Sequence, residues 1–143
     1  LKKERIIFIA PADGRAAGAW MDSRLRKGKL SAHSISSFPF VLTERGESYR
    51  YELERILAES DVELRAQLEI ANTETIVHMV EKGFGLSFLP AFSAERAIKA
   101  GTVLEAATEL PLVYMWLQLF YHKNKWLSPQ MEAFLKVTEE YFG

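Results

Sequence analysis

Two short stretches of the sequence place hydroxyl and amide side chains where an apolar run gives way to a helical pattern. Residues 42–50, Leu-Thr-Glu-Arg-Gly-Glu-Ser-Tyr-Arg, bring Ser48 to the start of one helix. Residues 71–75 bring Asn72 and Thr73 to the start of another. The free N–H groups and the dipole of a helix N-terminus favour an anion, so each stretch predicts an anion-binding cradle. Such side chains also cap their own helices, and capping preference alone supports the two interpretations equally.

Patterns that would indicate catalysis or metal binding are weaker. His78 follows Glu74 by four residues and precedes Glu81 by three, which permits a metal site but is more typical of a solvated, ion-paired helix face. The His-Ser pair at 33–34 lacks the Gly-x-Ser-x-Gly turn of a serine nucleophile. The Gly-Phe-Gly at 83–85 precedes a predicted strand, whereas a dinucleotide-binding loop follows one. We therefore expect no enzyme activity, no metal and no cofactor.

Composition and charge limit the class of protein. The chain has 143 residues, 48% of them hydrophobic, which suffices for one domain with its own core. Its 18 Lys and Arg are balanced by 19 Asp and Glu, so the net charge does not attract DNA, and the basic run at 24–29 is typical of a solvated loop. The absence of cysteine excludes disulfides and thiolate chemistry and is compatible with a reducing cytoplasm.

Two features of the chain concern its surroundings. The longest apolar run, residues 110–121, is too short to cross a membrane and is interrupted by Gln118, so we expect a soluble protein without membrane contact. The sequence begins Leu-Lys-Lys-Glu-Arg, without Met and without an apolar signal segment. We therefore expect a segment of a longer protein that resides in the cytoplasm.

Strand and helix patterns alternate along the chain. Residues 6–9 are a continuous apolar run, which predicts a buried strand of the kind that parallel sheets favour, and residues 15–37 predict a surface loop with one helical turn near Trp20. The remaining predicted elements are a strand at 40–43, a helix at 47–60, a strand at 67–71, a helix capped at Asn72 and Thr73 that stops at 82–83, a strand at 85–89, a helix capped by Ser93 and ended by Gly101, a strand at 113–121, and a helix that starts at Ser128 and Pro129.

This alternation predicts an α/β domain with a mostly parallel sheet and helices on both faces. No internal repeat or low-complexity linker divides the chain. Ligands of such folds collect beyond the carboxyl ends of the strands, and both candidate cradles follow a predicted strand. The two cradles are therefore expected to face one crevice.

The same motifs, in the same order, resemble those of LysR-type transcriptional regulators. Pro-Phe-Val-Leu-Thr-Glu-Arg-Gly-Glu-Ser-Tyr-Arg at 39–50 resembles the strand of their second lobe that leads into a Gly-x-Ser-Tyr-Arg helix start. Residues 68–76 are similar to the strand and helix that follow, and residues 80–90 to the V-x-x-G-x-G-x-x-x-L-P strand and turn. Tyr-His-Lys-Asn-Lys-Trp-Leu-Ser-Pro at 121–129 resembles the entry to their last helix. The resemblance is collinear over nearly the whole chain.

The resemblance implies a periplasmic-binding-protein-like (type II) effector domain, in which two α/β lobes enclose a ligand cleft. It assigns residues 1–121 to the second lobe and residues 122–143 to a return segment and terminal helix that would pack on the first lobe. The winged helix-turn-helix, the linker helix and the opening half of the first lobe have no counterpart here. Glu47 stands where relatives often carry Cys or Ser, and its negative charge disfavours a strongly anionic effector.

The resemblance also implies which residues bind the ligand. These are Thr43, Ser48, Tyr49, Arg50, Asn72 and Thr73. Among them, Thr43, Ser48 and Thr73 are expected to contact the ligand directly. Tyr49 fits the core equally well as an amphipathic aromatic residue. Glu44 and Arg50 have an alternative role as an ion pair that locks the loop.

Together these inferences predict the ligand-sensing domain of a LysR-family regulator that binds a small-molecule effector. If the two cradles bind anions, the effector is an anionic metabolite. DNA would be bound only through a domain outside this chain. A homo-oligomer is expected, because relatives pair their sensing domains and a lone second lobe exposes apolar surface. The alternative is a lobe of a solute-binding protein for uptake, which shares the fold, although residues 121–129 favour the regulator. A third reading, an enzyme, would require a perturbed His or carboxylate in a deep pocket.

Overall fold

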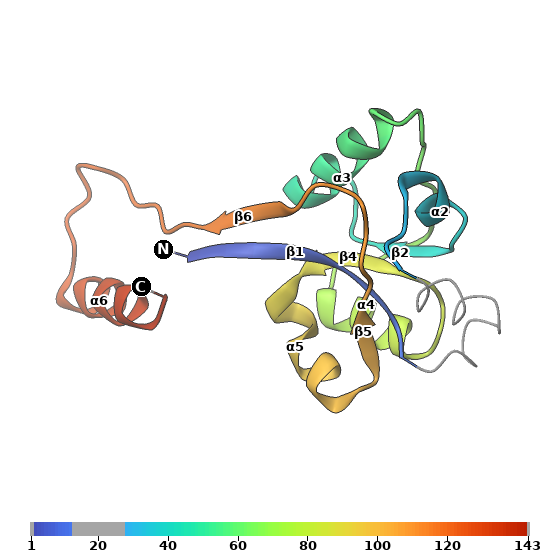
Figure 1. Ribbon diagram of the computed structural model, residues 1–143. Coiled ribbons are helices and arrows are strands. Elements are labelled where there is room, and N and C mark those ends of the chain that lie inside the picture. Colours follow the sequence, from blue (N-terminus) through green and yellow to red (C-terminus); the bar gives the residue numbers. More distant parts are fainter. Residues whose placement is uncertain (1, 13–27, 143) are drawn as a thin grey trace.

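The computed structural model describes residues 2–12 and 28–142, whose arrangement is shown in Figure 1. The helical turn predicted near Trp20 lies outside the described residues. Within them, no helix combines the length and the apolar character needed to span a bilayer. The strands are β1 (Lys2–Pro11), β2 (Phe40–Leu42), β3 (Ala66–Glu69), β4 (Ser87–Pro90), β5 (Val103–Glu105) and β6 (Val113–Leu117).

The long strand β1 lies at the centre of the sheet. It pairs with β4 on one side, while β5 and β6 pair with its two halves on the other, since Ile9 is opposite both Ser87 and Glu105 and Ile6 is opposite both Pro90 and Val113. Strands β2 and β3 form a pair of their own. A parallel bridge between Phe40 and Leu86 joins this pair to the segment that leads into β4.

The prediction about strand direction was partly wrong. Strands β2 and β3 are parallel, and the bridge to the β4 side is parallel too. Strand β1, however, is antiparallel to β4, β5 and β6, so the central ladders lack the parallel pairing that the apolar run at 6–9 predicts. A continuous apolar run reports burial on both faces of a sheet, and both directions of pairing satisfy that condition.

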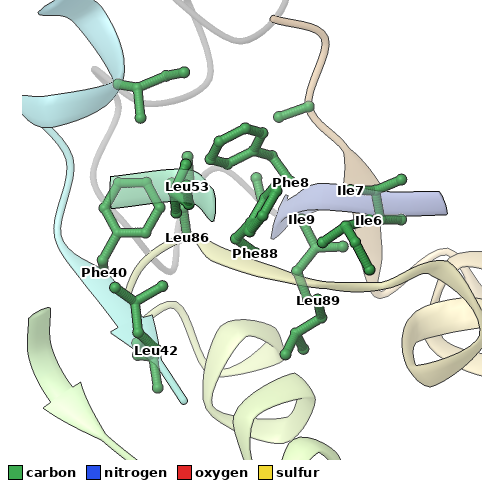
Figure 2. Close-up of a cluster of buried hydrophobic side chains, with 14 of the residues drawn as sticks. Ile6, Ile7, Phe8, Ile9, Phe40, Leu42, Leu53, Leu86, Phe88 and Leu89 are labelled. Atoms are coloured by element: carbon green, nitrogen blue, oxygen red, sulfur yellow. The ribbon is translucent and has the colours of Figure 1, made fainter. Parts of the chain in front are cut away.

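The helices cover both faces of this sheet, as predicted. Figure 1 shows α2 and α3 on one side of β1 and β4, and α4 and α5 on the other. On the first side, the ring of Phe8 packs against Phe88 at 4.6 Å between centroids and edge-on against Phe40 at 6.3 Å, with Leu53 of α3 beside them (Figure 2). The helices are α2 (Ala32–Ser36), α3 (Ser48–Ala58), α4 (Thr73–Glu81), α5 (Ala91–Ala100) and α6 (Pro129–Phe142).

Several helix ends match their sequence signals and others do not. Gly101 ends α5 in the left-handed conformation, as expected of a C-terminal glycine. Ser128 Oγ accepts a hydrogen bond from Met131 N (3.3 Å) at the start of α6, as predicted. Ser93 does not cap α5, because that helix already begins at Ala91, directly after Pro90 fixes the turn. The predicted surface loop contains the short helix α2, whose N-cap Ser31 accepts a hydrogen bond from Ser34 N.

The last strand and helix extend away from the rest of the chain. Strand β6 ends at Leu117, four residues earlier than predicted, and α6 has no buried residue. Figure 1 shows α6 standing apart, beyond the outer ends of β1 and β6. The aromatic side chains of Phe134 and Tyr141 are 62% and 80% exposed. Helix α6 is thus an amphipathic helix whose apolar face is not packed against the other described elements.

Gly85 allows two backbone segments to approach closely at the start of β4. Its φ of +151° is a conformation that L side chains rarely adopt, and an added Cβ would lie 2.3 Å from the carbonyl oxygen of Pro39. Leu86 N donates to that same oxygen (2.9 Å), so the contact belongs to the link between β2 and β4.

We expect Gly85→Ala to lower the free energy of unfolding by about 3 kcal/mol or more, because backbone strain and overpacking each cost about 1–3 kcal/mol. Gly101→Ala is the matched control, since φ is +72° there but no atom lies within 4 Å of the added Cβ. The control should lose only about 1–2 kcal/mol. Urea unfolding of the two variants would measure this, and equal losses would contradict the steric role of Gly85.

A candidate effector-binding site at two strand-to-helix junctions

The two predicted cradles leave the sheet at the same edge. Strands β2 and β3 are parallel, and Leu42 lies in register with Glu69 at their carboxyl ends. Ile70 N donates a hydrogen bond to Leu42 O (2.9 Å), which extends the pairing one residue further. The β2–α3 junction and the β3–α4 junction are therefore neighbours, as expected for ligand sites in open α/β sheets.

The first junction leaves a hydroxyl buried without a partner. Thr43 is 2% exposed, and its Oγ1 makes no hydrogen bond within the described residues. An unpaired buried hydroxyl costs about 1–3 kcal/mol, so its presence calls for an explanation. After a turn at Gly46, α3 begins at the exposed Ser48, and the N-cap residue Glu47 makes no side-chain capping bond. Ser48 is thus not the cap of its own helix, and within residues 2–12 and 28–142 no side-chain cap is found at the start of α3.

Tyr49 lies beside Thr43 and is 7% exposed. Burial raises the pKa of its phenol above the ordinary value, the nearby Thr43 side chain acts in the lowering direction, and the Glu47 carboxylate raises the pKa further. The Thr43 side chain lies close enough to lower the pKa of Tyr49, but by distance and angle Thr43 Oγ1 has no hydrogen-bond partner among the described residues. Tyr49 therefore presents a neutral hydroxyl next to the unpaired one, from a ring that is mostly in the core.

Arg50 is buried and fully engaged with protein groups on three sides. Its Nη1 donates to Thr43 O, its Nε to Glu54 Oε1 (3.1 Å), and its Nη2 to Glu69 Oε1 (3.0 Å). Arg50 does lock the loop, but through the Thr43 carbonyl and these two carboxylates; Glu44 is not its partner. The four-residue spacing of Arg50 and Glu54 on one helix predicts that pair. The pair with Glu69 cannot be predicted in this way, because Glu69 lies on β3, 19 residues further along the chain.

The second junction is capped by its own asparagine. Asn72 Oδ1 accepts hydrogen bonds from Thr75 N (2.9 Å) and Thr75 Oγ1 (3.2 Å), so the capping interpretation holds for this residue in the structure. Thr73 is the first residue of α4 and is partly exposed. The amide oxygen of Asn72 is thus occupied by the cap, whereas Thr73 carries a partly exposed hydroxyl.

A hollow of about 380 Å³ opens beside the first junction, between α3 and β6. On the α3 side its lining consists of Ser48, Tyr49 and Glu52, and on the β6 side it includes Tyr114 and Trp116. The β6 residues were not identified from the sequence, because they lie more than 60 positions from Ser48 and no local pattern links the two segments. Asn72 and Thr73 do not line this hollow.

His78 contacts a carboxylate of its own helix. His78 Nδ1 lies 3.2 Å from Glu81 Oε2, and Glu81 also accepts a hydrogen bond from Thr102 Oγ1 (2.6 Å). The Thr102 hydroxyl lowers the pKa of Glu81 most, and His78 lowers it further. Across residues 2–12 and 28–142, no three His, Cys, Asp or Glu side chains are grouped so as to hold a metal ion. The arrangement is the ion-paired helix face that the spacing favoured.

A sheet with helices on both faces and polar junctions at the carboxyl ends of its strands defines one lobe of a periplasmic-binding-protein-like domain. Solved structures share this fold. The effector binding domain of QuiR in complex with shikimate matches with a TM-score of 0.74 at 15% identity, over 99% of this chain and 63% of that chain. The regulatory domain of Synechocystis PCC6803 CcmR in complex with 2-PG matches with a TM-score of 0.70 at 18% identity, over 99% of this chain and 64% of that chain.

Sequence comparison identifies the family. The family model described as LysR substrate binding domain matches residues 2–143, and the chain belongs to this family. The HTH-type transcriptional regulator YeiE of Escherichia coli (strain K12) is 30% identical over 135 residues, which make up 94% of this chain and 43% of that protein. The chain thus spans less than half the length of this curated relative. A solute-binding protein for uptake, the alternative drawn from the sequence, is not favoured by these matches.

The capping role of Asn72 predicts a stability loss on its removal. Asn72→Ala should lower the free energy of unfolding by about 1 kcal/mol, since the N–H of Thr75 loses its acceptor. Asn72→Asp should retain stability, because Asp caps about as well as Asn. Urea unfolding measures both, and an Ala variant as stable as the parent would contradict the capping role of Asn72.

Proposed function

We propose that this chain is the ligand-sensing part of a LysR-family DNA-binding transcriptional regulator and that it binds a small-molecule effector in a cleft between two lobes. The observation that carries the proposal is the buried, unpaired hydroxyl of Thr43 beside an α3 N-terminus without a side-chain cap. A ligand oxygen or N–H group placed there would supply the missing partner. The QuiR and CcmR domains, which share the fold, are complexes with shikimate and 2-PG, respectively.

The proposed contacts are divided between the two junctions. Thr43, Ser48 and Thr73 would contact the effector directly, since their hydroxyls are free or lie at a helix start. Tyr49 would close one side of the site with its neutral hydroxyl. Asn72 would act through its cap, which holds Thr73 and the first turn of α4 in place.

The proposed effector is a small metabolite rich in hydrogen-bonding oxygens, and a carboxylate is its most favourable charged group. The dipole at the α3 N-terminus attracts negative charge. Glu47 precedes the helix and Glu52 lines the hollow, and the pKa of Glu52 is lowered by its hydrogen bond from Arg55, so both carboxylates oppose a multiply charged anion. A single negative charge surrounded by hydroxyl groups fits this balance.

The proposed mechanism is a population shift between lobe arrangements. An effector that binds both lobes stabilises the closed arrangement by its differential affinity for that state, and the change is passed to a DNA-binding domain outside this chain. The chain itself would carry out no chemical reaction and would need no cofactor. A regulator that acts on DNA would reside in the cytoplasm.

We further propose that residues 122–143 form a unit separate from residues 1–121 and pack on the first lobe. The support is that α6 has no buried residue and stands beyond the ends of β1 and β6. Its apolar side chains, with those of Phe120 and Trp126, amount to an exposed surface of the kind that marks an interaction site. Homo-oligomerisation of the chain is part of this proposal.

Replacing Thr43 should separate binding from stability. Thr43→Val removes the unpaired hydroxyl and keeps the shape, so the free energy of unfolding should stay equal or rise. The regulator's thermal shift with any stabilising metabolite from a panel of hydroxylated carboxylic acids should be abolished. Ser87→Ala is the matched control, because Ser87 is the other buried hydroxyl without a partner among the described residues and lies within β4. An unchanged thermal shift in the Thr43 variant would refute the site.

The exposed face of α6 should cause the 143-residue chain to self-associate. Sedimentation velocity should show a dimer or larger species that dissociates in the double variant Phe134→Ser, Tyr141→Ser. Tyr51→Ser is the control, since Tyr51 is 68% exposed but lies on α3. A monodisperse monomer of the parent chain would contradict the role given to this face.

A further inference from the structure

Arg50 is a full positive charge inside the protein, with an exposure of only 2%. A buried guanidinium is tolerated only where carboxylates and carbonyl oxygens compensate for the water it loses. Its three partners, the Thr43 carbonyl and the carboxylates of Glu54 and Glu69, belong to three different segments. The planar, forked guanidinium can reach in several fixed directions at once, which a lysine ammonium on its single flexible stem does not match.

The partners of Arg50 lie on both candidate junctions. Thr43 is the first residue of the β2–α3 junction, and its carbonyl accepts from Nη1. Glu69 is the last residue of β3, three positions before the cap residue Asn72, and its carboxylate accepts from Nη2 at 3.0 Å. One side chain therefore connects the backbone that carries the unpaired hydroxyl with the strand end that leads into α4.

Arg55, a second arginine on α3, serves as a comparison because its ion pairs join no separate segments. Arg55 is exposed and binds Glu52 of α3 (2.6 Å) and Glu59, the C-cap residue of the same helix (2.7 Å). These contacts brace a single helix and reach no other segment. The burial of Arg50 and the origin of its partners are therefore not general properties of arginines on α3.

We infer that Arg50 is a positioning residue, which holds the two strand-to-helix junctions in one arrangement with Glu69 as its partner on the second junction. Its functional meaning rests on the proposed function, since the junctions are the walls of the proposed effector site. Arg50 does not contact the effector. It fixes the direction of the Thr43 side chain through the Thr43 carbonyl, and it fixes the start of the loop to Asn72 and Thr73 through Glu69.

The link between the junctions depends on the charge of Glu69. The hydrogen bond from Arg50 lowers the pKa of Glu69 most, desolvation opposes it, and the charges of Arg50 and Arg45 lower the pKa further. Glu54, from α3, shares the guanidinium. Since the folded-state pKa of Glu69 is depressed, the link is fully present above the ordinary carboxyl pKa of about 4.3 and is lost as the pH falls through the depressed value.

Amide hydrogen exchange of Glu69→Gln in the complete regulator tests the inference. Glu69 has an exposed side chain, so the variant should fold. The amides of Tyr51, which bonds to Glu47 O, and of Ile76, which bonds to Asn72 O, report the first turns of α3 and α4. Both should exchange about tenfold faster, the effect of losing one charge-assisted hydrogen bond, while Ala106 in the central sheet stays unchanged. A change at Ile76 alone would overturn the link.

The pH profile and two further variants complete the test. In the parent protein, protection of Tyr51 and Ile76 should fall together below the ordinary carboxyl pKa, and in Glu69→Gln it should not. Arg50→Lys should reproduce the faster exchange at both junctions, whereas Arg55→Lys should leave both unchanged. A purely structural role of Arg50 would instead raise exchange at Ala106 as well, with no pH response tied to Glu69. Exchange needs no effector, so a failed metabolite screen and a failed link are separate results.

Discussion

The burial of β1 is the constraint on which the rest of the fold depends. Residues 6–10 are buried, so their backbone groups must be paired within the sheet and their side chains covered on both faces. Strand β4 supplies the backbone partners on one side and β5 with β6 on the other. The helices on the two faces complete the cover. Because β4 also carries the link to β2, the register of β1 determines where the two polar junctions leave the sheet.

The first junction contains both a fully hydrogen-bonded arginine and a buried hydroxyl without a hydrogen-bond partner among the described residues. Arg50 is held by three protein partners, yet the Thr43 hydroxyl, attached to one of those partners, has none among the described residues. Because three protein groups compensate the charge of Arg50, one further partner for the Thr43 hydroxyl is structurally feasible at the same junction. In the proposed site, keeping this hydroxyl unpaired would lower stability and provide a preorganised group for a ligand, which is the usual relation between a binding site and its scaffold.

The sequence alone predicted those features of the fold that depend on neighbouring residues in the chain. The alternation of strands and helices, the cap at Asn72 and the end of α5 at Gly101 follow from side chains next to one another in the chain, and the structure agrees with each. The direction of β1, the Glu69 partner of Arg50 and the β6 wall of the hollow depend on segments far apart in sequence. Hydrophobic periodicity reports burial and not the identity of the neighbour, so these features required the structure. Local patterns supported cradle and cap equally at Ser48, Asn72 and Thr73, and the family resemblance added Thr43, Tyr49 and Arg50 to the expected ligand-binding residues.

The pairing of β1 with β6 has a mechanical consequence. Lys2 lies opposite Leu117 and Ile6 opposite Val113, so the two strands form an antiparallel ribbon that projects from the sheet toward α6 (Figure 1). A hydrogen-bonded ribbon of two strands resists stretching and shear between its members, but it bends out of its own plane with little loss of pairing. Lys3, whose ammonium lies 4.2 Å from the ring centroid of Tyr114, braces one surface of it. Whatever mass is attached at its outer end can thus swing about an axis across the ribbon, and it cannot slide along it.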